Sequence, residues 1–265
     1  MNSHPTGHGT QVRIAGNTST GVLKLLALVF MMVDHVGVTL LPGVPEMRMI
    51  GRLAFPIYAW CIVAGVAYTR NRLKYLLRLL LTGLLCQLPY LIALNHYKGP
   101  LSAMTLNDFI STPNVFLTLS LGMAAIWGVD EKKYLSHIWA PAAALLLAQV
   151  TGCDYGWRGV MLILLLYLVR DSRRGIAAVM IAFCMFWGSF SFPVSTFLGL
   201  PVNTGKWPSA ISSLLSPMLR LQAMAVFSLP FILIPFRSNW KMPRWLSYSL
   251  YPAHLLVLLL LEKIF

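Results

Sequence analysis

The chain has 265 residues, of which 57% are hydrophobic and only 11% are charged. Soluble domains have about 45–50% apolar and about 25% charged residues, so this composition excludes an ordinary soluble fold and indicates a membrane protein. The 21 Lys and Arg against 8 Asp and Glu give a formal net charge of +13. In a soluble chain that excess would indicate a nucleic-acid surface, but the apolar background argues against a nucleic-acid partner. Disordered and disulfide-rich classes are excluded by the apolar content and by the presence of only four cysteines.

The first 21 residues are polar and rich in Gly, Ser and Thr, which predicts a short mobile tail. Residues 22–265 are predicted to form one transmembrane domain, an all-α polytopic bundle. It contains nine mostly apolar runs, each close to the roughly 17–25 residues that a membrane-spanning helix requires. The runs are Val22–Leu41, Arg52–Thr69, Lys74–Leu94, Pro113–Val129, Tyr134–Thr151, Trp157–Val169, Gly175–Phe192, Leu219–Phe236 and Leu246–Ile264.

The lysines and arginines predict the orientation of this bundle. If nine spans alternate in direction, 14 of the 21 basic residues fall on one side. Because short cytoplasmic loops hold the excess of Lys and Arg, this bias predicts a cytoplasmic N-terminus and a C-terminus outside. The two longest loops, Asn95–Thr112 and Pro193–Met218, are then also outside.

Two adjacent titratable residues, Asp34 and His35, interrupt the first run. They lie about ten residues beyond Lys24, or about 15 Å at 1.5 Å per residue, which places them near the middle of the membrane. Titratable groups are costly at that depth, by about 2.5–3.5 kcal/mol each, so a functional reason is expected. A carboxylate beside an imidazole fixes its tautomer and raises its basicity, and we therefore expect Asp34 to assist His35 as a general base.

The last run contains a second histidine, His254, about ten residues beyond Arg244 and so at a similar depth. Tyr251, three residues earlier, shares its helix face. The sequence leaves open whether these two helices are neighbours and whether His35 or His254 is the base. His254 could instead make a structural hydrogen bond or, with Tyr251, contact a carbonyl oxygen of the substrate.

Other polar residues lie at the predicted outer side. Arg52 opens the second run, where an interfacial anchor is the simpler interpretation and a functional role is the alternative. Asp154 and Arg158 are four residues apart, which would allow an ion pair at the outer mouth of the bundle. The four cysteines have no metal-type spacing, so no metal site is expected.

Two basic segments lie on the predicted cytoplasmic side. Their residues are Arg70, Arg72, Lys74, Arg78, Arg170, Arg173 and Arg174. The simpler interpretation is that these charges set the topology. The functional alternative is an anion site that holds a diphosphate or a 3′-phosphate.

Six sequence blocks, in order along nearly the whole chain, resemble the TraX family of conjugal-transfer membrane proteins. They are DHVG from Asp34, GRLAFPIYAW from Gly51, TRNRLKYLLRL from Thr69, PNVFLTLSLG from Pro113, DYGWRG from Asp154 and YPAHL from Tyr251. The resemblance implies a multi-pass protein of the bacterial inner membrane that acetylates the N-terminus of conjugative pilin, with acetyl-CoA as cosubstrate. More distantly, the first two runs resemble polytopic acetyltransferases, with Lys24, His35 and Phe55-Pro56 at the shared positions.

Together these features predict an acetyltransferase site. The expected catalytic residues are His35, Asp34 and His254, and the expected substrate-binding residues are Arg52, Tyr251, Asn114, Asp154 and Tyr155. The seven basic residues above are expected to bind acetyl-CoA. Direct transfer is favoured because no cysteine or serine is placed to carry the acetyl group, and a covalent acetyl-histidine is the alternative. The expected partners are pilin and membrane lipid. The alternatives are a proton-coupled transporter and a non-catalytic pilin assembly factor.

Overall fold

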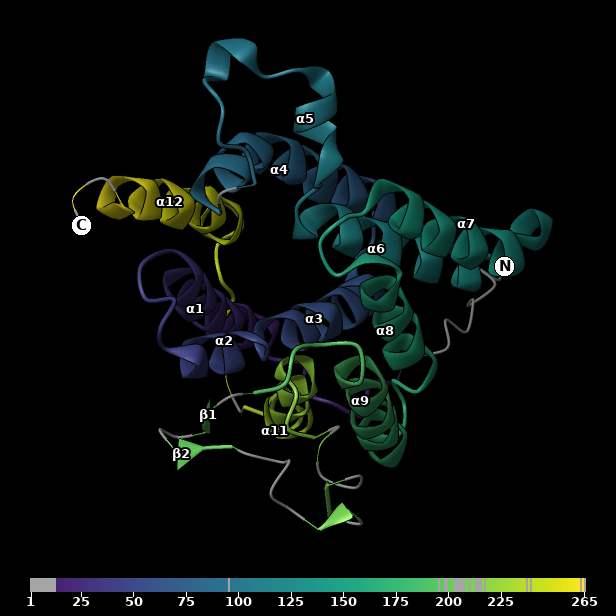
Figure 1. Ribbon diagram of the computed structural model, residues 1–265. Helices are drawn as coiled ribbons and strands as arrows, with labels where there is room; N and C mark the ends of the chain where they lie inside the picture. The colour runs from purple at the N-terminus through teal and green to yellow at the C-terminus, as the bar shows by residue number, and fades with distance from the viewer. Residues whose placement is uncertain are drawn as a thin grey trace, which may run out of the picture.

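The computed structural model describes residues 13–94, 96–194, 196–197, 200–202, 208–209, 211–212, 216, 218–236, 238, 240–262 and 264; the predicted tail over residues 1–12 lies outside them. The described residues form a bundle of helices (Figure 1). The longer helices are α1 (Thr20–Thr39), α3 (Ala54–Tyr68), α4 (Arg72–Ala93), α6 (Val115–Glu131), α7 (Ser136–Thr151), α8 (Gly156–Leu168), α9 (Arg173–Gly188) and α12 (Arg244–Glu262). The shorter ones are α2 (Pro45–Gly51), α5 (Leu106–Ser111), α11 (Leu229–Leu233) and the 3₁₀ segments η1 (Leu101–Ala103), η2 (Lys133–Leu135) and η4 (Leu221–Ser228).

The predicted all-α fold is confirmed for the described residues, apart from two strands of two residues each, β1 (Thr196–Phe197) and β2 (Leu200–Pro201). Helical structure coincides with each of the nine apolar runs, although the eighth run is a 3₁₀ segment followed by the short α11. Three segments are long and apolar enough to cross a membrane: Thr20–Thr39, Pro45–Tyr68 and Arg72–Ala93. A membrane protein is therefore indicated, whereas the count of nine spans stays a prediction.

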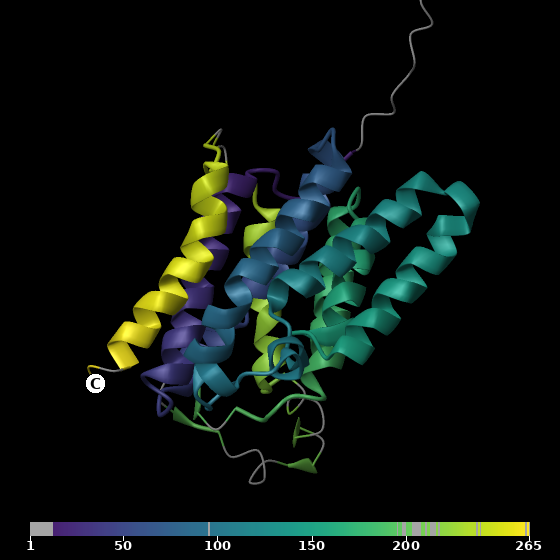
Figure 2. The same cartoon turned by 90° about the horizontal axis from the view of Figure 1, so that it is seen from above.

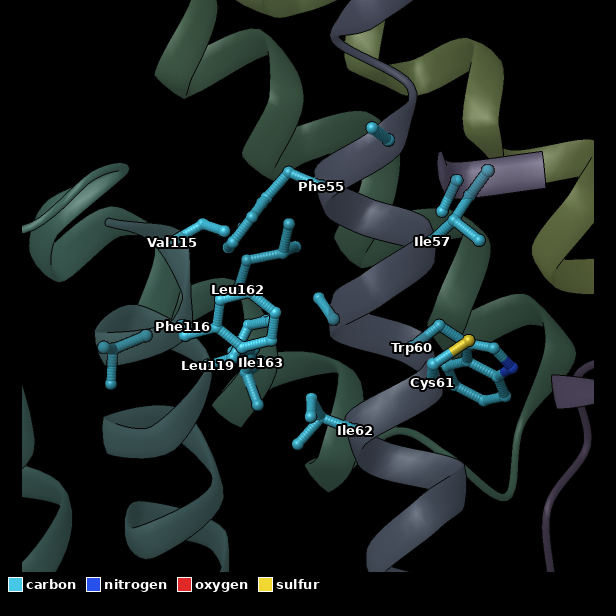
Figure 3. Close-up of a cluster of buried hydrophobic side chains, with 14 of the residues drawn as sticks. Phe55, Ile57, Trp60, Cys61, Ile62, Val115, Phe116, Leu119, Leu162 and Ile163 are labelled. Atoms are coloured by element: carbon cyan, nitrogen blue, oxygen red, sulfur yellow. The ribbon is translucent and has the colours of Figure 1, made fainter. Parts of the chain in front are cut away.

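Helix α3 lies at the centre of the bundle. It is apolar on all sides and most of its residues are buried, as expected for a helix with no solvated face. Figure 3 shows Phe55 and Ile62 pointing toward Ile163 of α8 and its neighbours on α6, while Ile57 and Trp60 point away from them. Because α3 is packed on opposite sides, residues at its start are held between α1 and α8.

The bundle has two distinct ends, which we call the N-terminal end, where α1 begins, and the C-terminal end, where α12 ends. Figure 2 shows the long helices running side by side between them, with α12 (yellow) beside α1 (purple). At the N-terminal end Arg72 of α4 binds Asp130 of α6 at 2.5 Å. At the C-terminal end Thr196 of β1 donates a hydrogen bond to Glu46 of α2 at 2.8 Å.

The segment before α1 is packed into the bundle from Ile14 onward, which differs from the expected mobile tail. The Asn17 side chain is fully buried and donates hydrogen bonds to the carbonyls of Phe231 and Ile234, at 3.0 and 2.8 Å. Helix α11 is only five residues long, so these carbonyls lack full helical partners and need a donor from elsewhere. The indole of Trp60 in turn donates to the Asn17 carbonyl at 2.7 Å.

Candidate functional site

A polar cavity of about 260 Å³ opens between the start of α3 and the helices around it. Its lining comes from α1, α2, the α2–α3 turn, α3, α4 and the loop after it, the start of α6, the α7–α8 turn and α12. The titratable residues in the lining are Asp34, His35, Arg48, Arg52, Tyr58, Tyr90, His96, Asp154, Tyr155 and Tyr251. The cavity lining therefore contains residues from all but one of the six sequence blocks, and these blocks are up to more than 200 positions apart in the sequence.

Asp34 is held by two arginines. Its Oδ1 atom accepts a hydrogen bond from Arg48 Nε at 3.0 Å, and its Oδ2 atom binds Arg52 Nη2. The side chains of Asp34 and Arg52 are only 10% and 12% exposed, so this is a largely buried charge cluster. Burial of a carboxylate is favourable only when charge and hydrogen bonds compensate the lost hydration, and the two guanidinium groups do this. The interpretation of Arg52 as an interfacial anchor does not fit this placement.

Gly51 makes this cluster sterically feasible. A Cβ atom at position 51 would collide with the Cβ, Cγ and Oδ1 atoms of Asp34. The helix also breaks here, because α2 ends at Gly51 and α3 begins at Ala54. The break places Arg52 in the intervening turn, from which its side chain reaches Asp34.

The two membrane-depth histidines are in direct contact. His35 Nδ1 and His254 Nε2 are 2.8 Å apart, and the imidazole rings stack with centroids 5.1 Å apart. Helices α1 and α12 are thus neighbours at this depth, which the sequence left open. The ring of Tyr251 lies edge-on to both imidazoles.

The hydrogen bonds fix the tautomers of a neutral histidine pair. His254 Nδ1 lies 3.1 Å from the Leu250 carbonyl, which can only accept, so Nδ1 of His254 carries its proton. His254 Nε2 must then accept from His35 Nδ1. The second nitrogen of His35, Nε2, is left with a free lone pair, and His35 lines the cavity whereas His254 does not.

Asp34 therefore does not orient His35 as expected. Adjacent helix positions point about 100° apart, so Asp34 faces the arginines on α2 and the following turn while His35 faces α12. Through its hydrogen bond, His254 occupies the orienting position that was expected of Asp34.

The turn between α7 and α8 places Asp154 and Tyr155 on the cavity wall. Tyr155 has a φ of 65°, a left-handed conformation that costs a bulky residue about 1–2 kcal/mol. In this conformation its ring stacks on Phe55 with centroids 4.0 Å apart, and the Arg52 guanidinium lies 5.9 Å above it. The Asp154 amide donates to the Pro113 carbonyl at 2.9 Å, which anchors the turn at the C-terminal end.

The ion pair expected between Asp154 and Arg158 is not among the salt bridges of the described residues. Arg158 instead stacks on the rings of Trp157 and Phe190, at 5.0 and 4.8 Å from their centroids. Asp154 points toward the cavity and Arg158 toward the aromatic residues at the end of α9, so the spacing of four residues does not bring their charges together.

Asn114 has a structural role at the start of α6. Its oxygen accepts from the Phe116 amide at 3.0 Å, which caps the helix. Its amide group donates to the Gly83 carbonyl at 2.7 Å and to Gln87 at 2.9 Å. Both amide protons are therefore used within the fold, and Asn114 does not line the cavity.

A narrow crevice of about 60 Å³ lies on the other side of the cavity wall. It is lined by Lys24, Cys61, Tyr75, Met242 and Tyr248 among others. Lys24 stands one turn into α1, so the crevice faces the N-terminal end. The cavity and the crevice share four lining residues, namely Met31, Tyr58, Val115 and Tyr251. These four residues form a thin wall between two hollows that face opposite ends of the bundle.

The seven basic residues expected to bind a phosphorylated cosubstrate lie at the N-terminal end, but none lines the cavity or the crevice. Arg72 is paired with Asp130, which also accepts a hydrogen bond from Tyr167. Arg170 lies 3.9 Å from the centroid of the Tyr167 ring, so Asp130 and Tyr167 connect the two basic segments. The exposed members of the set are Arg70, Lys74, Arg173 and Arg174.

Three features of the site were not foreseen from the sequence: the role of Arg48 as a partner of Asp34, the presence of His96 in the cavity lining, and the fit of Gly51. A signal for the first was present, because one buried acid needs positive charge nearby and Arg48 precedes Arg52 by one helical turn. His96 follows the end of α4 in a loop and carries no periodic signal. In the described part of the chain no three His, Cys, Asp or Glu side chains gather as metal ligands.

Comparison with known proteins gives a family and two relatives. The family described as TraX protein matches residues 19–262. A protein described as a probable fimbrial assembly protein FimC, serogroup H1, of Dichelobacter nodosus is 33% identical over 162 residues, which cover 57% of this chain and 63% of that protein. An uncharacterized protein, RP591, of Rickettsia prowazekii (strain Madrid E) is 22% identical over 251 residues, covering 92% of this chain and 91% of that protein. No solved structure matches the chain.

Proposed function

The chain belongs to the TraX family, and from this we propose that it is a membrane-embedded acetyltransferase that moves an acetyl group from cytoplasmic acetyl-CoA to the N-terminal amine of conjugative pilin. Family membership and the likeness to a protein named for fimbrial assembly support a pilin-related role. The observation that carries the acetyltransferase proposal is the oriented histidine pair, with His35 facing the cavity and His254 behind it.

His35 is the proposed general base. Acylation of an amine requires a group that takes the proton from the attacking nitrogen, and the free lone pair of His35 Nε2 is suited to this. His254 is the positioning residue, because its hydrogen bond sets the tautomer of His35. A positioned base contributes about 10²- to 10⁴-fold to a rate, so loss of His35 should have a larger effect than loss of His254.

Arg52 is the proposed partner of the developing oxyanion. Its described hydrogen bonds use Nη2 and Nε, which leaves Nη1 for a group in the cavity. Asp34 holds the guanidinium in place before the reaction, and preorganised donors of this kind stabilise charge that forms in the transition state. Tyr251, Asp154 and Tyr155 line the same cavity and are proposed to contact the acceptor.

In the proposed reaction the amine nitrogen attacks the thioester carbonyl and a C–N bond forms, while the carbonyl electrons move to the oxygen beside Arg52. His35 takes a proton from the nitrogen. Collapse of the intermediate breaks the C–S bond, and the same proton passes from His35 to the departing sulfur. No acetylated side chain is required, consistent with direct transfer.

The two hollows give each substrate its own route. Acetyl-CoA is proposed to reach the wall through the crevice at the N-terminal end, and the pilin terminus through the cavity at the C-terminal end. The excess of basic residues supports a cytoplasmic N-terminal end in a bundle of nine spans in the inner membrane. The exposed residues Arg70, Lys74, Arg173 and Arg174, with Arg72, Arg78 and Arg170, are proposed to hold the CoA phosphates.

The test is the intact mass of mature pilin from cells that express variants of this protein. We expect an acetyl-sized increment with the wild type, none with His35→Ala, and a reduced acetylated fraction with His254→Ala. His137→Ala is the matched control, because His137 is exposed at the N-terminal end and far from the cavity lining.

Full acetylation with His35→Ala would exclude His35 as the base. Loss with His254→Ala but not with His35→Ala would exchange the two roles. If pilin from cells that express the wild-type protein were unacetylated and still assembled normally, a non-catalytic assembly factor would be favoured instead.

A further inference from the structure

The mouth of the cavity carries two titratable residues, Asp154 and His96, whose charge and proton have no part in the reaction steps above. Asp154 lines the cavity from the α7–α8 turn, and His96 lines it from the loop after α4. His96 is exposed, and its ring stacks on Tyr90 with centroids 5.0 Å apart. His35, in contrast, is only 8% exposed at the inner side of the same cavity.

The charges around the cavity are arranged unevenly. Asp34 is shared by Arg48 and Arg52, so that cluster has a net charge of +1. Asp154 forms no salt bridge within 4.0 Å among the described residues, and Arg52 is the basic side chain whose charge acts most strongly on it. An entering cation would be repelled by the arginine cluster and attracted by Asp154, beside which the stacked rings of Phe55 and Tyr155 provide aromatic surface.

The proton balance of amine acylation requires a group at this mouth that accepts a proton. An α-amino group has a pKa of about 7.7–8.0, so near pH 7 it arrives mostly as an ammonium ion. The ammonium and the thioester give an amide, a thiol and one released proton. His35 passes to the sulfur the proton that it takes from nitrogen during attack. The proton released overall is therefore the one that the ammonium loses before attack, and a group other than His35 must accept it.

We propose that Asp154 binds the acceptor as a primary ammonium ion at the cavity mouth and that His96 takes its first proton and passes it to the solution outside. This rests on the proposed acetyltransferase function. The N–H bond of the ammonium breaks, its electron pair stays on nitrogen, and the neutral amine moves inward to the thioester. His96 is suited to this step because it is exposed to solvent and can release the proton after each turnover.

The surroundings of His96 keep it ready to accept a proton. Partial burial lowers the pKa of His96 below its usual value, because desolvation favours the neutral form of the ring. The other titratable groups in the cavity lining are Asp34, His35, Arg48, Arg52, Tyr58, Tyr90, Asp154, Tyr155 and Tyr251. Asp34 and the arginines are paired with one another, and four of the others are tyrosines. His35 has a free lone pair but is buried, so His96 is the lining histidine with access to solvent.

The experiment measures the rate of acetyl transfer against pH with the purified full chain in lipid nanodiscs, acetyl-CoA and a synthetic peptide that carries the mature pilin N-terminus. At pH 6.5 roughly one peptide in twenty is neutral, whereas at pH 9 nearly all are. We expect His96→Ala to lower kcat/KM about tenfold at pH 6.5 and by less than about twofold at pH 9. Asp154→Asn should raise KM for the peptide at pH 6.5 and leave KM nearly unchanged at pH 9.

Matched variants separate these effects from misfolding and from the main reaction. Asp108→Asn and His137→Ala change groups of the same types that do not line the cavity, and both variants should keep the wild-type profile. His35→Ala should lower the rate by a similar factor at every pH. If His96→Ala and Asp154→Asn gave profiles parallel to the wild type, the proposal for the mouth would be wrong while acetyl transfer stood. If the wild type transferred no acetyl group at any pH, the proposed function itself would fail.

Discussion

Asp34 and His35 are adjacent in the sequence but act in different parts of the site. Asp34 binds Arg48 and Arg52, and His35 binds His254. The divergence follows from the 100° between adjacent helix positions. The sequence indicates that both residues are unusual at that depth, but their partners depend on which helices pack against α1, and nothing in the local pattern specifies that packing.

At this scale Gly51 gives a sharp prediction. Gly51→Ala should displace the Asp34 carboxylate, weaken its contacts with both arginines and lower acetyl transfer as strongly as Asp34→Asn does. The forced contact should also destabilise the protein by about 1–3 kcal/mol, as overpacking typically does. Transfer activity and the Tm in detergent would be measured together.

The matched control for that substitution is Gly43→Ala. A Cβ atom at position 43 meets no other atom within 4 Å, so both activity and Tm should stay at the wild-type values. If Gly51→Ala and Gly43→Ala gave the same activity and the same Tm, the close approach of Asp34 to the helix break would have no effect on either quantity.

At the scale of elements, the apolar runs gave the positions of the helices to within a few residues, because each run must bury its backbone polar groups by hydrogen bonding along the helix. The short elements η1, α5, β1 and β2 lie in segments predicted only as loops, and three further features differ from the prediction. The separate α2 arises from a break at Gly51–Leu53, the eighth run is mainly 3₁₀, and residues 14–19 are packed rather than mobile. Each depends on a contact with a distant segment, such as that of Asn17 with α11, and periodicity carries no information on such contacts.

Asn17 tests the packing of that segment. Asn17→Ala removes the donor for the carbonyls of Phe231 and Ile234 and leaves both unsatisfied. Leaving a buried acceptor without a partner costs about 1–3 kcal/mol, and each kcal/mol lowers Tm by about 2–4 °C in a protein of this size. We therefore expect a clear fall in Tm, measured by thermal unfolding in detergent.

Thr18→Ala is the comparison for that experiment, because Thr18 is the exposed neighbour of Asn17. It should leave Tm nearly unchanged. An unchanged Tm for Asn17→Ala would mean that the segment before α1 does not anchor α11.

At the scale of the whole molecule, two hollows face opposite ends of one bundle and meet at the wall formed by Met31, Tyr58, Val115 and Tyr251. The sequence supplied the expectation of a site near the middle of the membrane through His35 and His254. Side chains from many helices form the two hollows, so the amino-acid sequence without the helix packing does not predict them. In the proposed reaction, this arrangement would let a donor and an acceptor from opposite sides of a membrane meet at the wall.

The most direct test of the central claim uses sealed lipid vesicles that contain the protein, with acetyl-CoA trapped inside and the pilin N-terminal peptide outside. Peptide mass is followed with time for the wild type and for His35→Ala. We predict acetylation by the wild type when the two substrates are on opposite sides, little when both are outside, and none with His35→Ala. Equal acetylation with both substrates outside, or with His35→Ala, would contradict transfer through a His35 site that is open to both ends.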